Sequence, residues 1–264
     1  MSISKKKDLD FMARGIANST TFNKEKCLEK ALKARDNIKI ETSQKEALKD
    51  ADLLIESITE NFDIKTAFFK QIQPFMPQKT VIVTNSSTLL PSKLARYTGR
   101  SDKFLALHFA NTIYKNNIAE IMKHSGTDDK YFEEIISFAE AINMIPLAAR
   151  EEKAGYLLNS MLVPFLLSAM DLLANGVSDA QTIDKAWILG TGAPKGPFQI
   201  IDTVGLITTK NIVLQYQKVP DIFDPLFKKM LLPYNYDGML KILDQYINEG
   251  KLGKSTKEGF YNYK

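Results

Sequence analysis

Four polar residues could carry out acid–base chemistry if the fold brings them together: Ser87, His108, Glu120 and Asn159. Each lies inside, or at the end of, an apolar segment, so the folded chain can hold its side chain on a rigid element. A hydroxyl, an imidazole, a carboxylate and an amide suit the removal of a proton from an alcohol whose carbon loses a hydride. Histidine changes its charge near neutral pH, so His108 is the natural base.

Each of these residues also has a purely structural interpretation. A lone histidine at a strand end, such as His108, is commonly a hydrogen-bonded core residue, and Glu120 could be a surface carboxylate on an edge strand. Ser87 could be a turn residue, and Asn159 could cap a helix. Glu120 and His108 support each other's catalytic interpretation. A carboxylate inside an apolar strand is costly without a partner, and a buried imidazole supplies one.

Two other kinds of site are less favoured. A Ser-His-Glu hydrolase would present its nucleophile in a Gly-x-Ser-x-Gly turn, and Ser87 does not lie in such a turn. A metal site is not supported, because two histidines and one cysteine without ligand spacing offer no set of ligands. The sequence therefore predicts proton transfer rather than hydrolysis or metal chemistry.

The elements that must position these residues alternate between strand and helix up to about residue 150. Strands are predicted at 37–40, 51–58, 80–83, 104–109, 118–122 and 144–149, and helices at about 8–33, from 42, at 62–75 and at 131–141. This alternation favours an α/β fold with a doubly wound parallel sheet, in which ligands bind at the carboxyl ends of the strands.

Only helical patterns follow, at 156–174, 180–189, 206–216 and 238–248. We place the domain boundary at the charged stretch 150–153. The expected domains are then an α/β domain at 1–152 and an all-helical domain at 153–264. The helical domain carries more apolar residues than a small core normally hides, which predicts a two-fold homodimer. The residues behind this expectation are Leu166, Leu167, Leu172, Leu173, Phe223, Leu226, Leu231 and Leu232.

Composition excludes several classes of protein. The 264 residues carry a net charge of +4, and the lysine triplet at 5–7 is too short for a nucleic-acid surface. The apolar segment at 156–174 contains Asn159, Pro164 and Asp171, so it suits a buried helix better than a membrane span. One cysteine and no secretory signal favour a soluble cytoplasmic protein that binds neither nucleic acid nor a membrane.

Six short runs occur in a fixed order between 47 and 264. They are Glu56-Ser57-Ile58-Thr59-Glu60-Asn61 followed by Lys65; Thr84-Asn85-Ser86-Ser87-Thr88-Leu89; His108-Phe109-Ala110-Asn111-Thr112 with Glu120; Gly155-Tyr156-Leu157-Leu158-Asn159-Ser160; Gly196-Pro197 through Asp202 to Gly205-Leu206; and Gly259-Phe260-Tyr261-Asn262-Tyr263. Together they resemble the 3-hydroxyacyl-CoA dehydrogenase family, including the bacterial 3-hydroxybutyryl-CoA dehydrogenases.

The resemblance implies an NAD-dependent oxidoreductase of fatty-acid metabolism that acts on an acyl-CoA substrate. It implies catalytic roles for Ser87, His108, Glu120 and Asn159. It also implies that residues 1–152 form an incomplete Rossmann-like, dinucleotide-binding domain that lacks the first strand, turn, helix and second strand. In this domain Glu60, Lys65, Asn85 and Ser87 bind the cofactor.

Some positions depart from the family's motifs. Where the family has His-Phe-Phe-Asn-Pro and Gly-Phe-x-x-Asn-Arg, this chain has Ala110, Thr112 and Ser160, and Ser255 stands where many members have a second lysine. The family's opening Gly-x-Gly-x-x-Gly turn has no counterpart, because no glycine occurs between Gly15 and Gly99. We therefore expect the 264 residues to bind NAD weakly or not at all. A redox-inactive, dimeric acyl-CoA-binding member of the family is the alternative.

Overall fold

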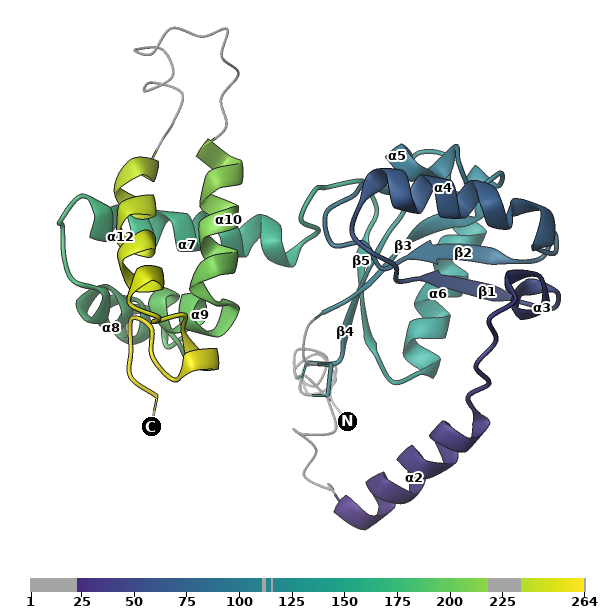
Figure 1. Cartoon of the computed structure of the whole chain (residues 1–264), viewed down its shortest axis with the longest axis horizontal. Coiled ribbons are helices and arrows are strands. Elements are labelled where there is room, and N and C mark those ends of the chain that lie inside the picture. The colour runs from purple at the N-terminus through teal and green to yellow at the C-terminus, as the bar shows by residue number, and fades with distance from the viewer. Residues whose placement is uncertain (1–22, 111–112, 115, 218–233, 264) are drawn as a thin grey trace, which may run out of the picture. The chain divides into compact units, whose positions relative to one another are not determined.

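The computed structural model describes residues 23–110, 113–114, 116–217 and 234–263. The chain forms two compact units, residues 1–158 and 159–264 (Figure 1). The boundary lies where the chain enters α7 (Leu158–Ala174), a few residues after the charged stretch 150–153.

A five-stranded sheet forms the centre of the first unit. Its strands lie in chain order and are β1 (Leu53–Glu56), β2 (Val81–Thr84), β3 (Phe104–Phe109), β4 (Ile118–Met122) and β5 (Ile145–Ala149). Neighbouring strands run parallel except for β3 and β4, which are antiparallel. The segment 110–117 between these two strands is too short for a helical crossover, so the chain reverses direction there. The predicted α/β sheet is confirmed, with this one antiparallel pair.

Helices cover both faces of the sheet (Figure 1). On one face α6 (Asp129–Ala141) packs Phe132 and Ile135 against inward-facing strand residues such as Leu105 and Ile121. The other face is covered by α3 (Gln44–Leu48), α4 (Phe62–Ile72) and α5 (Pro91–Ala95), and short 3-10 turns occur at η2 (Gln73–Phe75) and η3 (Ser101–Lys103). Successive strand residues point to opposite faces, so the apolar runs of the strands supply both cores at once.

The segment before the sheet differs from the prediction. The structure has α2 (Lys24–Asn37) followed by extended chain, and the strand expected at 37–40 is absent. Ile38 ends the helix, with its N–H bonded to the carbonyls of Ala34 and Arg35, and Ile38 and Ile40 are 70% and 89% exposed. A strand needs a neighbour for its hydrogen bonds, and among the described residues β1 pairs only with β2. The part of the predicted first helix before residue 23 lies outside the described residues.

The regular elements of the second unit are helices in the residues that the structure describes, and two isolated β-bridges join residues near the end of the chain. After α7 come α8 (Ala180–Thr191), α9 (Pro197–Val204), α10 (Leu206–Gln217) and α12 (Tyr236–Asn248), then the 3-10 turn η4 (Lys254–Thr256). The helix α9 was not predicted, because two closely spaced prolines precede most of it. No helix among the described residues is long and apolar enough to cross a membrane.

Two buried aspartates hold the last described residues in place. Asp184 accepts hydrogen bonds from the backbone of Phe198 and from the hydroxyl of Tyr261. Asp202 accepts from the backbone N–H groups of Phe260 and Tyr261 and from a tyrosine hydroxyl at 263. Both aspartates are 1% exposed. Such carboxylates are stable only because their oxygens are hydrogen-bonded.

Asp202→Asn tests this anchor. The amide keeps one acceptor oxygen but turns an NH2 group toward N–H or O–H donors, so we expect unfolding to become about 1–3 kcal/mol easier. Trp187, the single tryptophan, lies on α8 and reports urea unfolding of this unit by fluorescence. The matched control is Asp244→Asn, which removes a surface ion pair with Lys210 and should cost less than about 1 kcal/mol. If the two substitutions lowered the free energy of unfolding equally, Asp202 would not be an anchor of the last described residues.

Candidate active site

His108 and Glu120 lie opposite each other in the antiparallel pair of β3 and β4. Residues directly opposite on neighbouring strands project to the same face and touch. The distance from His108 Nδ1 to Glu120 Oε2 is 3.3 Å, and the side chain of Glu120 is 1% exposed. The reversal of the chain between β3 and β4 therefore creates the pair that the sequence predicted.

The turn into α7 holds the other oxygen of Glu120. Oε1 accepts hydrogen bonds from the backbone N–H groups of Leu157 at 3.0 Å and Leu158 at 2.9 Å. An ionised carboxylate can only accept, so His108 donates from Nδ1 to Glu120. In neutral His108 the lone pair then lies on Nε2, the tautomer that a base needs at that atom.

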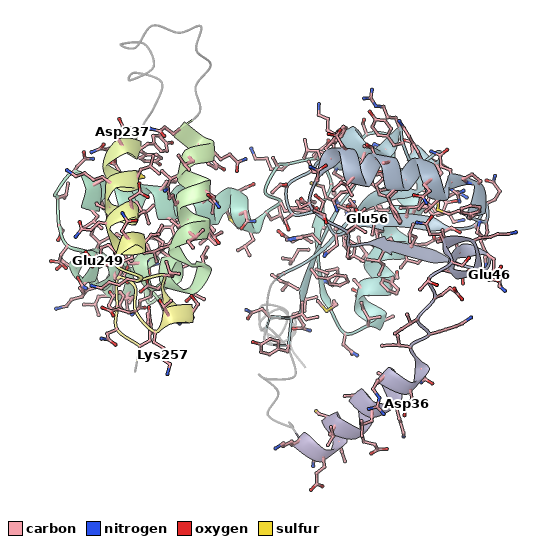
Figure 2. All side chains as sticks on the ribbon, viewed as in Figure 1. Asp36, Glu46, Glu56, Asp237, Glu249 and Lys257 are labelled. Carbon is pink, nitrogen blue, oxygen red and sulfur yellow. The ribbon has the colours of Figure 1, made fainter. Side chains whose placement is uncertain are left out.

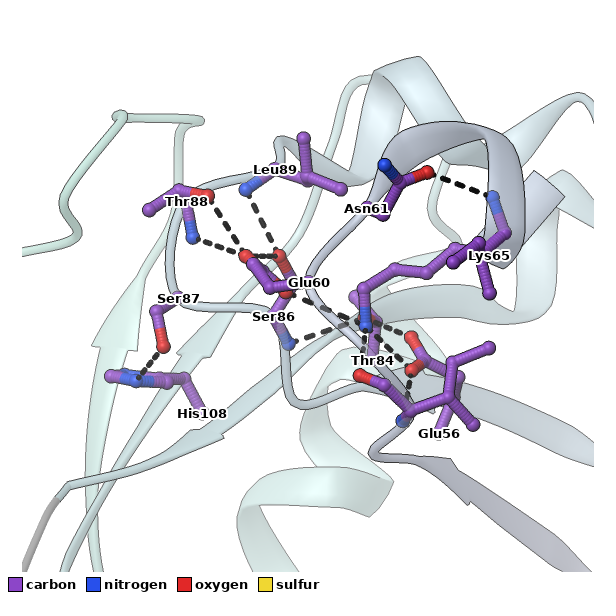
Figure 3. A network of polar contacts seen from close by, with 12 residues as sticks. Glu56, Glu60, Asn61, Lys65, Thr84, Ser86, Ser87, Thr88, Leu89 and His108 are labelled. Atoms are coloured by element: carbon purple, nitrogen blue, oxygen red, sulfur yellow. Dashed lines mark hydrogen bonds and ion pairs between the residues drawn. The ribbon is translucent and has the colours of Figure 1, made fainter.

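Ser87 lies on the side of Nε2. Its hydroxyl is 3.1 Å from His108 Nε2, and it belongs to the loop that follows β2 at the carboxyl end of that strand (Figure 3). Ser87 is exposed, and the side chain of His108 is 13% exposed. The structure thus brings together Ser87, His108 and Glu120 in a chain of contacts that ends at an accessible hydroxyl.

Asn159 lies in the first turn of α7, next to Leu158, and is the first residue of the second unit. Its contact with a substrate stays a prediction. Asn111 and Thr112, which belong to the motif around His108, lie outside the described residues.

A second polar network lies at the ends of β1 and β2, and Figure 3 shows its contacts. Glu56 accepts hydrogen bonds from Lys65 Nζ at 2.6 Å and from the hydroxyl of Thr84, its register partner, at 2.7 Å. Lys65 Nζ also donates to the carbonyl of Ile58 at 3.1 Å. The side chains of Lys65 and Glu56 are 1% and 0% exposed, and Figure 2 shows Glu56 inside the first unit.

Glu60 links this network to the loop that carries Ser87. It accepts hydrogen bonds from the hydroxyl of Ser86 and from both the N–H and the hydroxyl of Thr88, and its other oxygen is 3.5 Å from Lys65 Nζ. Partial burial acts to raise the pKa of Glu60. The hydrogen bonds from Ser86 and Thr88 and the charge of Lys65 outweigh it and hold this pKa below its usual value. Glu60 is therefore a charged acceptor, 38% exposed, beside the predicted catalytic residues.

Asn85 has a structural contact. Its side-chain oxygen accepts a hydrogen bond from the N–H of Phe109 at 2.9 Å, which ties the end of β2 to the end of β3. This contact holds Ser87 and His108 together at the carboxyl ends of β2 and β3. Whether Asn85 also contacts the cofactor stays a prediction.

Sequence reasoning missed two residues of this region. Glu56 ends an apolar strand, and a buried strand that ends in a carboxylate nine residues before a lysine was a signal for the ion pair. Tyr156 was quoted only as part of a motif, yet its ring stacks on His108 with centroids 4.8 Å apart and planes at 21°. No periodic pattern indicates that contact, because Tyr156 lies in the turn before α7.

Comparison with known proteins shows to which family the chain belongs. Residues 4–152 match the NAD binding domain of 3-hydroxyacyl-CoA dehydrogenase, and residues 155–263 match its C-terminal domain. The chain belongs to the 3-hydroxyacyl-CoA dehydrogenase family. It is an NAD-dependent oxidoreductase, and the redox-inactive alternative is not favoured.

Relatives and solved structures agree with the family. Human mitochondrial hydroxyacyl-coenzyme A dehydrogenase is 33% identical over 95% of this chain and 79% of its own length. The 3-hydroxybutyryl-CoA dehydrogenase of Clostridioides difficile is 30% identical over 84% of this chain and 74% of its own. A solved diketoreductase, described as acting on dicarbonyl compounds, is 42% identical, with a TM-score of 0.81 over 98% of this chain and 84% of its own.

Lys65→Met tests the energetic weight of the network. It leaves the carboxylate of Glu56 buried without its counter-ion, so we expect a loss of about 3–5 kcal/mol in the stability of β1 and β2, measured by peptide-resolved hydrogen exchange. The control Lys79→Met removes an exposed ion pair with Asp52 and should cost less than about 1 kcal/mol. The double substitution Glu56→Leu with Lys65→Met should recover most of the loss. If Lys65→Met alone behaved like the control, the buried pair would not hold the two strands.

Proposed function

We propose that the chain interconverts the 3-hydroxyacyl and 3-oxoacyl forms of an acyl-CoA, with His108 as the catalytic base. The observation that carries this proposal is the chain of contacts from Ser87 through His108 to Glu120, which leaves the lone pair of Nε2 toward an exposed hydroxyl. A small alcohol has the same hydrogen-bonding groups as that hydroxyl.

In the oxidation direction, His108 Nε2 takes the proton of the C3 hydroxyl while the C–H bond at C3 breaks and a C=O bond forms. NAD, when bound, supplies the acceptor for the hydride. Glu120 stabilises the imidazolium that results, because its carboxylate already accepts from Nδ1 and is held by two backbone N–H groups. Ser87 and Asn159 hold the C3 oxygen. The reverse direction uses the imidazolium as the acid.

The residues at the carboxyl ends of β1 and β2 fit the cofactor. Glu60 is a partly exposed carboxylate whose position is fixed by Ser86 and Thr88, and a charged acceptor of this kind suits a ribose hydroxyl. Lys65 is 1% exposed and holds Glu56 and Glu60 in place, and its contact with the cofactor stays a prediction.

A second candidate has support of its own. The solved diketoreductase is 42% identical to this chain, more than the human and clostridial dehydrogenases quoted above. Small or polar residues at Ala110 and Ser160 replace residues of the family's motifs. The same chemistry at His108 would then act on a dicarbonyl compound that carries no CoA.

His108→Gln tests both candidates. Loss of a general base costs about 10²–10⁴ in rate, so turnover of acetoacetyl-CoA with NADH should fall by that factor. The control is His124→Gln at the other histidine, which is 5% exposed and bonded to the backbone of Ser101, and which should lower stability rather than kcat. Near-normal kcat in His108→Gln would remove His108 as the base.

The same assay separates the two candidates. We expect a higher kcat/KM for acetoacetyl-CoA than for an ester of acetoacetic acid, and the opposite order would favour the diketoreductase activity. NADH is used at up to millimolar concentration, because we expect it to bind weakly in the absence of a Gly-x-Gly-x-x-Gly turn. This weak binding stays a prediction. A dissociation constant in the low micromolar range, measured by calorimetry, would contradict that expectation.

The chain also forms a homodimer through its helical unit in this proposal. Leu166 and Leu167 pack into the unit's own core, but the same unit leaves other apolar side chains exposed. These are Met161 at 68%, Leu172 at 39%, Trp187 at 40%, Leu189 at 73% and Ile207 at 51%. These exposed apolar side chains support an interface between two copies of the helical unit. Phe223, Leu226, Leu231 and Leu232 lie outside the described residues.

A cytoplasmic location stays a prediction, and the human relative is mitochondrial.

Sedimentation equilibrium at micromolar concentration tests the dimer, and we expect twice the mass of the chain. The double substitution Met161→Glu with Leu189→Glu places charges on the exposed apolar surface and should weaken association at least tenfold. The control is Leu28→Glu on α2, which is 58% exposed in the first unit and should leave association unchanged. A monomer of the unaltered chain at this concentration would exclude the dimer.

A further inference from the structure

One aromatic residue contacts two parts of the candidate active site. The ring of Tyr156 stacks on the imidazole of His108, with centroids 4.8 Å apart and an angle of 21° between the planes, and Tyr156 is 1% exposed. The stack restricts the rotation of the imidazole about its χ2 torsion. Glu120 contacts Nδ1 at 3.3 Å and the exposed Ser87 contacts Nε2 at 3.1 Å, and the stack adds a restraint on the face of the ring that neither of these contacts supplies.

The hydroxyl of the same residue reaches the opposite side of the site. Tyr156 donates a hydrogen bond of 2.6 Å to the carbonyl of Ser86, which belongs to the peptide group that leads into Ser87. Burial, followed by the charges of Glu120 and Glu60, raises the pKa of Tyr156 above its usual value, so the hydroxyl keeps its proton and remains a donor. This hydrogen bond fixes the peptide from which the Ser87 side chain projects toward His108.

The backbone around Tyr156 is shaped for these contacts. Tyr156 has φ +53° directly after Gly155 with φ +83°, and left-handed backbone is costly for a bulky aromatic residue. The N–H of Tyr156 bonds to the carbonyl of Lys153, and the next two N–H groups bond to Glu120. One turn of chain therefore contacts Ser86, His108 and Glu120 through a hydroxyl, a ring and two amides.

We propose that Tyr156 is a positioning residue for the dehydrogenase reaction, with two separable parts. Its ring sets the plane of His108, and its hydroxyl sets the loop that carries Ser87. The proposal rests on the role of His108 proposed above. The family's motif has phenylalanine at this position, so the link from the hydroxyl to Ser86 distinguishes this chain from that motif.

Two variants separate the parts. Tyr156→Phe keeps the ring and removes the hydroxyl, and it should lower kcat about three- to tenfold. Tyr156→Leu removes both, and its kcat should fall about 30- to 100-fold with KM changed less than threefold. Both are compared with Tyr97→Phe and Tyr97→Leu in the same unit, where Tyr97 packs edge-on to Phe62 and should leave kcat unchanged. All rates are measured below the onset of thermal unfolding of each variant, so that lost fold is not counted as lost kcat.

Two readouts do not depend on turnover. The ring protons of His108 should carry a ring-current shift in NMR spectra that Tyr156→Phe retains and Tyr156→Leu loses. Assignment is simple, because the chain has two histidines and His124→Gln removes the other signal. Hydrogen exchange at residues 85–89 should accelerate in both Tyr156 variants and in neither Tyr97 variant. The shift reports the ring, and the exchange reports the hydroxyl.

The outcomes distinguish this proposal from the proposed function. If Tyr156→Leu kept full kcat while His108→Gln lost it, Tyr156 would not position the base and the role of His108 would stand. If His108→Gln kept full kcat, the proposed function would fall, and the positioning role with it. Unchanged histidine shifts in Tyr156→Leu would show that the stack does not exist in solution, and unchanged exchange at 85–89 in Tyr156→Phe would overturn the role of the hydroxyl.

Discussion

The buried carboxylate of Glu120 is the interaction on which the rest of the site depends. It lies on β4, pairs with His108 on β3, and accepts the backbone N–H groups of Leu157 and Leu158. A carboxylate that is 1% exposed is stable only if every one of these partners is in place. Burial of this charge therefore requires both the antiparallel pairing of β3 with β4 and the turn into α7. Because both contact the same carboxylate, each of these features helps to hold the other in position.

A second buried carboxylate organises the neighbouring edge of the sheet. Glu56 and Thr84 are register partners on β1 and β2, as Glu120 and His108 are on β4 and β3. Residues in these pairs alternate with apolar core residues along their strands, so all four side chains project to one face of the sheet. A network around Lys65 and Glu60 then supports the loop after β2, while Glu120 supports the imidazole. Two separate charge clusters thus position Ser87 and His108 from opposite sides.

Most of the architecture could be predicted from apolar runs. The spans of β3 and β4 agree with the structure residue by residue, and α4, α6 and α12 lie within a few residues of their predicted bounds. The strand expected at 37–40 was wrong, because two isoleucines at alternate positions do not reveal whether a neighbouring strand exists. The direction of β4 could not be predicted, since periodicity is the same in parallel and antiparallel strands.

The residues of the candidate site could be predicted from the sequence, but the contacts that hold them in place could be predicted less well. Ser87, His108 and Glu120 were found because each interrupts or ends an apolar segment at a strand. Tyr156 was missed because a residue in a turn belongs to no helical or strand periodicity in the sequence. Lys65 was assigned to the cofactor from the resemblance alone, and only the structure reveals that its ammonium group is enclosed by Glu56 and the carbonyl of Ile58.

The anchoring of the last described residues affects the order in which the two units form during synthesis. In the first unit every strand pairs with the strand next to it in sequence, so the sheet can grow as the chain leaves the ribosome. In the second unit Asp202 accepts its hydrogen bonds from residues 260–263, whereas Asp184 is already bonded to the backbone of Phe198 and gains the hydroxyl of Tyr261. Until those residues emerge, Asp202 lacks these tyrosine and backbone donors and must stay hydrated. The helical unit therefore completes its core in a single late step, and a nascent chain that stalls before this segment exposes the unit to chaperones and proteases.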